Sequence, residues 1–309
     1  MSAYSPADPT GRQFQLAGGD GRVTAHIAQV GASLRGLTVD GIDLIPPYPA
    51  GTPAPAASGT VLCPWPNRVR DGRWTQRGQT RQLALTEPAF SNASHGLLRF
   101  APYSVASMDA DAVTLTATVF PQTGYPFQLD TSVRFALTDS GLHVSHAIAN
   151  VGADDAPVAL GIHPYFQIGG VETADLRIRS SGSTRFVLDD RQLPVREEPV
   201  DAATDLRGAP RLGDLDLDTG YAGLVRDDDG RIRHELIADD GRTLTVWQGE
   251  GFDFVQIFTT DRYPGQDLAV AIEPMTAPAD ALNSGRGLRW LVPGEVWESE
   301  WGVEFRGSN

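Results

Sequence analysis

The chain has 309 residues, of which 41% are hydrophobic, and its 39 acidic and 25 basic side chains give a formal net charge of −14. This acidity repels phosphate groups, so it argues against nucleic acid and anionic membrane surfaces as partners. A single cysteine, Cys63, permits neither an intrachain disulfide nor a cysteine cluster for a metal. With no signal segment and no apolar run of about 18 residues, we expect a cytoplasmic protein.

Short strands joined by turns are the expected elements, because apolar and polar residues alternate on both sides of glycine-containing turns. The pattern is clearest in a predicted hairpin at residues 129–150, whose turn is Asp139-Ser140-Gly141. In chain order, the predicted strands fall within residues 23–44, 113–119, 129–150, 232–247 and 252–259. Amphipathic helices are absent, and the best helical candidate is a short turn at residues 202–206.

A single domain, residues 1–309, is expected from this pattern. The stretch 46–59, rich in proline, alanine and glycine, could be taken for a linker, but too few residues precede it to form a separate domain without disulfides. The strand-rich pattern predicts an all-β fold, a large β-sandwich of two sheets with few short helices.

Four segments carry more polar and aromatic residues than a buried strand should. They are WPNRVRDG at 65–72, SHG at 94–96, HPYF at 163–166 and EPMTAPADALNSG at 273–285. His163 and Glu273 each follow an apolar strand-like run and directly precede a proline, which stops a strand. We therefore expect both side chains at the rim of a sheet, where an imidazole and a carboxylate can perform paired acid–base chemistry.

The four segments, in this order, resemble signature segments of the aldose 1-epimerase (galactose mutarotase-like) family, and they span most of the chain. The resemblance implies a large β-sandwich with its site on the concave face of one sheet. It also implies an isomerase that interconverts the α and β anomers of a hexose by opening and closing the ring. No cofactor and no metal are implied, and the chain has no P-loop, dinucleotide fingerprint or nucleophile elbow.

Carried over residue by residue, the resemblance assigns Glu273 as the catalytic base and His163 as the catalytic acid. It assigns Arg68 to substrate binding and His95 to a hydrogen bond near the ring oxygen of the sugar. Asp218 matches an aspartate that holds sugar hydroxyl groups, although its flanking residues depart from the form seen in galactose enzymes.

Two further expectations concern the environment of this acid–base pair. Sugars have apolar faces, so we expect the aromatic side chains of Tyr165, Trp247 and Phe258 to contact the substrate. Glu273 should be ionised to act as a base, and His163 should hold a proton near neutral pH.

Three functions remain open from the sequence. The first is mutarotation of a free hexose. The second is mutarotation of an anionic hexose, either sulfoquinovose or a hexose 6-phosphate. It is considered because WPNRVRDG resembles a bacterial branch that includes a sulfoquinovose mutarotase. An anionic group requires a cation beyond Arg68, for which Arg70, Arg73 and Arg99 are candidates. The third is a non-catalytic sugar-binding module. In each case the partner is a small-molecule sugar, and the chain is a monomer or a homodimer.

Overall fold

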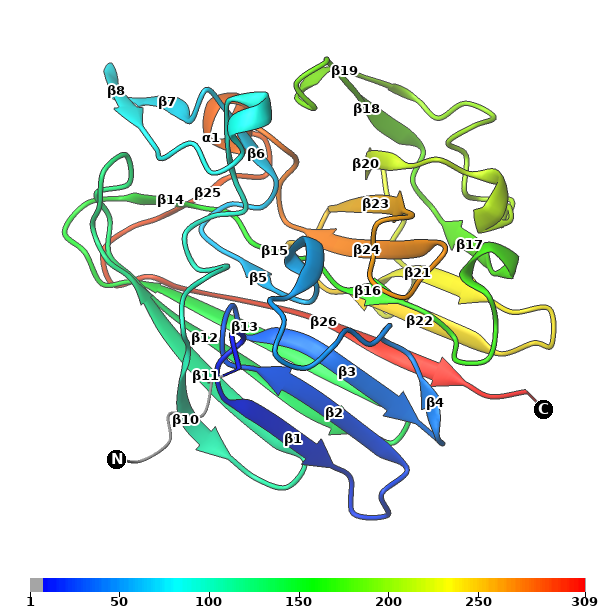
Figure 1. Cartoon of the computed structure of the whole chain (residues 1–309). Coiled ribbons are helices and arrows are strands. Elements are labelled where there is room, and N and C mark those ends of the chain that lie inside the picture. Colours follow the sequence, from blue (N-terminus) through cyan, green and yellow to red (C-terminus); the bar gives the residue numbers. More distant parts are fainter. Residues whose placement is uncertain (1–7, 309) are drawn as a thin grey trace.

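Two eight-stranded sheets form the body of the protein, whose computed structural model describes residues 8–308 (Figure 1). The first, called here the β26 sheet, has the order β10 (Ser104–Met108), β11 (Ala112–Val119), β12 (Leu129–Thr138), β13 (Gly141–Asn150), β26 (Val296–Arg306), β22 (Thr243–Gln248), β21 (Ile232–Ile237) and β17 (Arg177–Ser180). The second, the β24 sheet, has the order β19 (Pro194–Pro199), β18 (Thr184–Leu188), β20 (Asp218–Ala222), β23 (Phe254–Thr260), β24 (Ala269–Met275), β15 (Gly161–Ile162) and β5 (Val61–Leu62), with β16 (Tyr165–Phe166) also paired to β24.

Smaller sheets cover the edges of this body. A four-stranded N-terminal sheet contacts β12 and β13 and consists of β1 (Gln13–Ala17), β2 (Val23–Ala28), β3 (Ser33–Val39) and β4 (Ile42–Asp43). Three strand pairs complete the set: β6 (Arg68–Arg70) with β9 (Asn92–Ser94), β7 (Arg73–Gln76) with β8 (Gln79–Gln82), and β14 (Ala156–Val158) with β25 (Arg289–Leu291). Within residues 8–308 the α-helix α1 (Ala281–Ser284) is short, and no helix there is long and apolar enough to cross a membrane.

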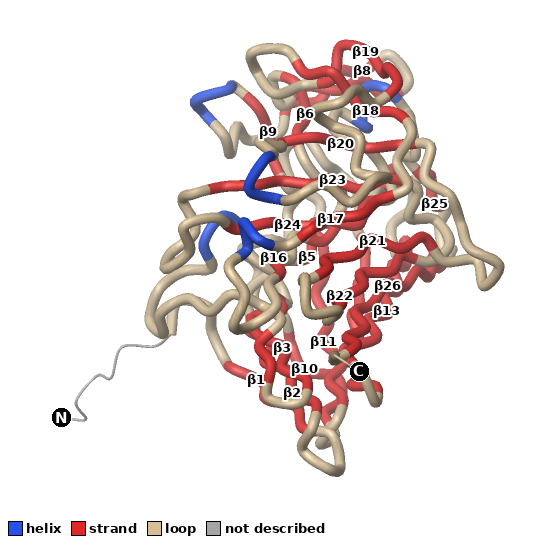
Figure 2. Tube along the Cα trace, turned by 90° about the vertical axis from the view of Figure 1, so that its right-hand side faces the viewer, coloured by secondary structure: helices blue, strands red, loops and turns tan. Residues whose placement is uncertain are grey.

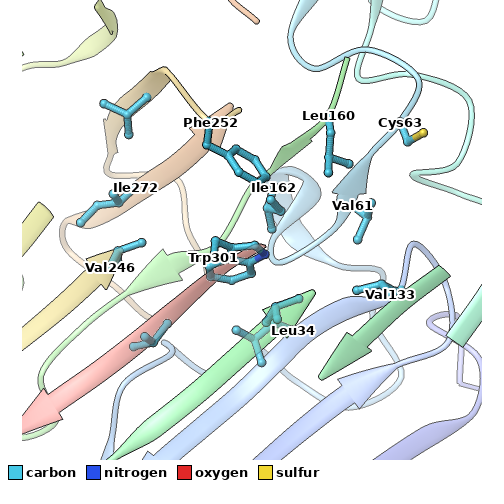
Figure 3. Packing of buried hydrophobic residues seen from close by; sticks show 14 of the residues in the cluster. Leu34, Val61, Cys63, Val133, Leu160, Ile162, Val246, Phe252, Ile272 and Trp301 are labelled. Atoms are coloured by element: carbon cyan, nitrogen blue, oxygen red, sulfur yellow. The ribbon is translucent and has the colours of Figure 1, made fainter. Parts of the chain in front are cut away.

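The core lies between the inner faces of these sheets, because alternate residues of a strand point to opposite sides. Trp301 and Val303 of β26 belong to the same buried cluster as Val270 and Ile272 of β24 and Leu34 of β3. Figure 3 shows the Trp301 ring with Leu34 below it and Ile272 beside it. Figure 2 shows β20, β23 and β24 stacked one above another, with β22, β26 and β13 beside and below them.

The predicted all-β sandwich is therefore confirmed, and so are most of the predicted strands. The hairpin at 129–150 is β12 and β13, and the hairpin at 232–247 is β21 and β22. The strands expected at 113–119 and 252–259 are β11 and β23. The region 23–44 forms three strands, and the turn at Asp40-Gly41 joins only the last two, β3 and β4.

A turn at 202–204 lies within the stretch where a short turn is expected, and the α-helix lies at 281–284. One local expectation is wrong. Glu273 does not end its strand, because β24 continues through Pro274, which lies opposite Val255 of β23, to Met275. Proline is tolerated there although it cannot donate a ladder hydrogen bond, so Glu273 lies within the sheet and not at its rim.

Replacing Trp301 tests this packing. The ring is fully buried and its Nε1 donates a hydrogen bond to Nε2 of His146 at 3.1 Å. We expect Trp301→Ala to lower the free energy of unfolding by about 3–5 kcal/mol, measured by urea denaturation followed by circular dichroism. Trp290→Ala is the matched control, since that ring is 43% exposed, and it should cost less than about 1 kcal/mol. Equal losses in the two variants would contradict a core centred on Trp301.

Candidate active site

Glu273 lies on the outer face of the β24 sheet. Its neighbours Val270 and Ile272 belong to the core, so the alternation of β24 turns Glu273 to the opposite side. On that outer face two small apolar clusters lie along β24, one containing Ala271 and the other Met275. The carboxyl group is therefore held between apolar surfaces, and its side chain is only 3% exposed.

His163 is placed opposite Glu273 by the register of two short strands. Gly161 of β15 pairs with Met275, and Tyr165 of β16 pairs with Ala271, so both strands follow the same antiparallel register on β24. His163 lies midway between them and therefore faces Glu273, with 3.3 Å between imidazole Nε2 and carboxyl Oε1. The predicted meeting of these two side chains, 110 residues apart in the chain, is confirmed.

The backbone around His163 is anchored to the loop before β5. The Gly59 N–H donates to the His163 carbonyl at 2.8 Å, and the His163 N–H donates to the Thr60 carbonyl at 3.2 Å. The imidazole remains 8% exposed, so the pair is nearly covered without being sealed in the interior. A small substrate that reaches this face can thus contact both groups.

His95 joins the pair from the loop that follows β9. Its ring centroid lies 5.5 Å from that of His163, with the two rings nearly perpendicular. The backbone of His95 is left-handed (φ 62°), as is that of Asn67 (φ 54°), and the His95 N–H donates to the Asn67 carbonyl at 2.8 Å. Gly96 follows with φ 70°, and a Cβ there would lie 2.3 Å from the Cys63 carbonyl oxygen, so only glycine fits.

Arg68 is held in place by a residue that the sequence reasoning did not identify. Its guanidinium makes a bidentate ion pair with Glu87, with Nε to Oε2 at 2.7 Å and Nη2 to Oε1 at 3.0 Å. The sequence offered no signal for Glu87, because it lies 19 residues from Arg68 and outside the four motifs.

Asp218, Gln256 and Phe258 lie on the same outer face as Glu273. Asp218 pairs with Phe258 across β20 and β23, and Gln256 pairs with Glu273 across β23 and β24. The Gln256 side-chain amide donates to the Asp218 carboxylate at 2.6 Å. Asp218 and Phe258 are therefore brought to the site as expected, while Gln256, in an unremarkable strand sequence, was not identified.

A narrow crevice continues from this group toward the β18–β19 hairpin. It is lined mainly by apolar side chains, together with the polar Asn67, Gln192 and Gln256, and its volume of about 10 Å³ has room for about one water molecule. Gln256 lies opposite Glu273 and the lining residue Met275 is two positions farther along β24, so the crevice begins beside the acid–base pair.

Two of the expected aromatic contacts need correction. Trp247 lies on β22 of the other sheet, where its ring contacts the guanidinium of Arg231 at 3.9 Å and the ring of His143, so it does not belong to this site. Tyr165 is adjacent to the site but fully buried. Its ring lies 5.4 Å from that of His163 and 4.7 Å from that of Tyr263, so it presents no free face to a sugar.

The electrostatics of the pair also differ from the expectation. Burial, followed by the charge of Asp218, raises the pKa of Glu273 well above its usual value, and Arg68 offsets this only in part. Burial, together with the charges of the nearby guanidinium groups of Arg99 and Arg68, lowers the pKa of His163 to about 4. The sugar-free site therefore favours a neutral carboxyl and a neutral imidazole, because the expected charged forms lose hydration.

Several buried polar atoms of the site have no hydrogen-bond partner among residues 8–308. They are Nδ1 of His163, Nδ1 of His95 and the hydroxyl of Tyr165. An unpaired buried polar group costs about 1–3 kcal/mol, so hydroxyl groups of a ligand or ordered water would satisfy them at a net gain. In the described part of the chain, no group of three or more His, Cys, Asp or Glu side chains is arranged to hold a metal.

Known proteins resemble this chain along nearly its whole length. The sequence profile of the aldose 1-epimerase family matches residues 12–304. The uncharacterized protein YihR of Escherichia coli K12 is 32% identical over 288 residues, which cover 93% of this chain and 91% of YihR. YphB of the same organism is 26% identical over 289 residues, covering 91% of this chain and 94% of YphB.

Solved structures agree with the fold described above. The GalM/aldose epimerase homologue from C. elegans has a TM-score of 0.83 at 18% identity, covering 96% of this chain and 100% of that one. The galactose 1-epimerase of Lactobacillus acidophilus has a TM-score of 0.79 at 20% identity, covering 96% and 95%. At such identities the likeness establishes the fold alone, a β-sandwich of the galactose mutarotase type.

The charge state of His163 can be measured in the sugar-free protein. With a pKa near 4, the imidazole should stay neutral from pH 8 down to about pH 5, whereas an unperturbed histidine titrates near 6.5. Proton–nitrogen NMR of the His163 ring, assigned by comparison with His163→Asn, provides the measurement. Titration of this signal between pH 6 and 7 would contradict the desolvated environment.

Proposed function

Because the chain belongs to the aldose 1-epimerase family, we propose that it is a mutarotase, an enzyme that interconverts the α and β anomers of a hexose. The observation that carries the proposal is the 3.3 Å contact between the imidazole of His163 and the carboxyl of Glu273. A hemiacetal opens when a base removes the C1 hydroxyl proton while an acid protonates the ring oxygen, and this pair supplies both functions.

The proposed cycle needs one proton shared between the two side chains. Burial favours that proton on Glu273 when no sugar is bound, and its transfer to His163 gives the carboxylate–imidazolium form. Glu273 then takes the C1 hydroxyl proton while His163 protonates the ring oxygen, and the C1–O5 bond breaks. After rotation about C1–C2, the ring closes on its other face with the two roles reversed, so protons and electrons balance without a cofactor.

The remaining site residues have supporting roles in this proposal. His95 lies beside His163 and has an unpartnered Nδ1, which suits a hydrogen bond near the ring oxygen. Asp218, held by Gln256, accepts hydrogen bonds from sugar hydroxyl groups, and Arg68 donates to them. Phe258, partly buried on the same face, offers an apolar contact to the ring.

Removing either member of the pair tests the mechanism. We expect Glu273→Gln and His163→Asn each to lower the mutarotation rate at least about a hundredfold, because each change removes one proton-transfer group. The rate is measured by magnetisation-exchange NMR, with circular dichroism as the control for folding. A folded Glu273→Gln enzyme with a near-normal rate would exclude Glu273 as the base.

The substrate is found by following anomer exchange by NMR across a panel of free, sulfonated and phosphorylated hexoses. Faster exchange of at least one sugar supports the proposal. Tight sugar binding without faster exchange of any of them would instead identify a non-catalytic sugar-binding module.

An anionic hexose is a second candidate substrate, supported by Arg99. Its guanidinium makes no ion pair within 4 Å and no side-chain hydrogen bond among residues 8–308, and its Nε is buried without a partner. Burial lowers its pKa, and it lies close enough to lower the pKa values of His95 and His163. A partly buried guanidinium without a counterion favours a sulfonate, phosphate or carboxylate as ligand.

This candidate predicts a charge-selective loss. We expect Arg99→Met to lower kcat/KM at least about tenfold for a sulfonated or phosphorylated hexose and to leave a neutral hexose within about twofold. Arg73→Met is the matched control, because Arg73 is an exposed residue of β7. Equal losses on charged and neutral sugars would assign Arg99 a structural role and remove the support for an anionic substrate.

A further inference from the structure

Glu87 is the carboxylate that pairs with Arg68, and neither the four motifs nor the family resemblance assigns it a role. Both of its oxygens are engaged by Arg68, at 2.7 and 3.0 Å. The side chains are only 15% and 24% exposed, so this bidentate pair is partly shielded from solvent. Such geometry distinguishes it from the mobile surface ion pairs that contribute little.

The local fold holds the Glu87 carboxylate in place. Glu87 and Asn92 exchange backbone hydrogen bonds of 3.0 and 3.2 Å across the short 3₁₀ turn Pro88–Phe90. Arg68 lies on the neighbouring strand β6, which pairs with β9, and its guanidinium stands 5.8 Å from the centre of the Phe90 ring. The turn therefore presents one carboxylate to Arg68 in a fixed orientation.

Glu87 lies among charged groups that shift the pKa values of the site residues. Arg68 and Arg99 both lower the pKa values of His95 and His163, and Arg68 lowers that of Glu273. Glu87 also acts on Arg99, whose pKa it raises against the effect of burial. The groups that face one another here are the two guanidiniums, the two imidazoles and three carboxyls, namely Arg68, Arg99, His95, His163, Glu87, Asp218 and Glu273.

We propose that Glu87 is a positioning and specificity-determining residue that acts through Arg68. It orients the guanidinium and cancels most of its charge, so that Arg68 serves as a hydrogen-bond donor to hydroxyl groups and does not capture free anions. Its effect on turnover rests on the proposed mutarotase function, whereas its effect on anion binding does not.

The direct test is a titration with inorganic sulfate, followed by calorimetry at constant ionic strength. In Glu87→Gln the Arg68 charge is no longer cancelled, and we expect sulfate to bind at least about tenfold more tightly than in the unmodified protein. Glu235→Gln is the matched control, because it removes a half-buried carboxylate that pairs with the exposed Arg179 on the other sheet and changes the net charge equally. Equal sulfate affinity in Glu87→Gln and the unmodified protein, or an equal gain in the control, would overturn the proposal.

A second readout reports on Glu273. Because Arg68 lowers the pKa of Glu273, we expect that pKa to be lower in a Glu87→Gln protein than in the unmodified protein, measured by carbon NMR of the Glu273 carboxyl. If the role of Glu87 were purely structural, the pKa of Glu273 would stay unchanged, or it would rise because Arg68 had moved away from the site. An unchanged or raised pKa in the folded variant would therefore contradict the proposal.

Glu87→Asp separates charge from orientation and also provides a milder variant. The shorter side chain keeps the negative charge but cannot hold both guanidinium nitrogens in the same geometry. We expect sulfate affinity to stay within about twofold of the unmodified protein while kcat/KM for the sugar falls at least about fivefold. A gain in sulfate affinity in this variant would refute charge cancellation.

If the unmodified protein turned over no sugar, the proposed function would fail while the sulfate comparison still decided the role of Glu87.

Discussion

One antiparallel register on β24 determines the geometry of the site. It places His163 on one side of Glu273 and Gln256 on the other, through strands whose residues lie far apart in the chain. Because side chains alternate between faces, a slip of one residue in β24 would turn Glu273 into the core in place of Ile272 and break the contact with His163. The acid–base pair is thus a property of sheet pairing, and its precision depends on the whole sandwich that fixes the strands.

Burial shifts the pKa values of the two members of this pair in opposite directions. A carboxylate and an imidazolium both lose hydration on the covered outer face, so each is driven toward its neutral form. One proton shared across 3.3 Å keeps the pair uncharged in total, whichever side chain holds it. That state avoids the cost of an isolated buried charge and keeps a proton within reach of both groups. The unpartnered Nδ1 atoms of His95 and His163 leave the site with hydrogen-bonding capacity that a polyhydroxylated ligand can use.

The sequence predicted the parts of this arrangement that depend on local chemistry. Alternation around turns identified the strands, and the residues that the family resemblance assigns to the site, His163, Glu273, His95 and Asp218, do lie together. What depends on long-range pairing was not predictable. Trp247 has the same strand character as the site residues, and only the strand order shows that it faces the outside of the other sheet. Pro274 by itself predicts the end of a strand, yet β24 continues through it, because the pairing with β23 tolerates one residue without a backbone N–H.

Glu87, which the sequence did not identify, has the position that the proposed control of specificity requires. Sugars are neutral and rich in hydroxyl groups, so a cation near them is useful as a donor but attracts competing anions. A carboxylate that engages two guanidinium nitrogens partly offsets the charge of Arg68 and, with Nη1 also donating to Asn67, leaves the N–H groups that contact neither residue available to hydroxyl groups. Arg99 has no such partner among residues 8–308, so its charge is not offset by an ion pair. Under the proposed function, the balance between an arginine in an ion pair and one without, and not the shape of the acid–base pair, would separate a neutral from an anionic substrate.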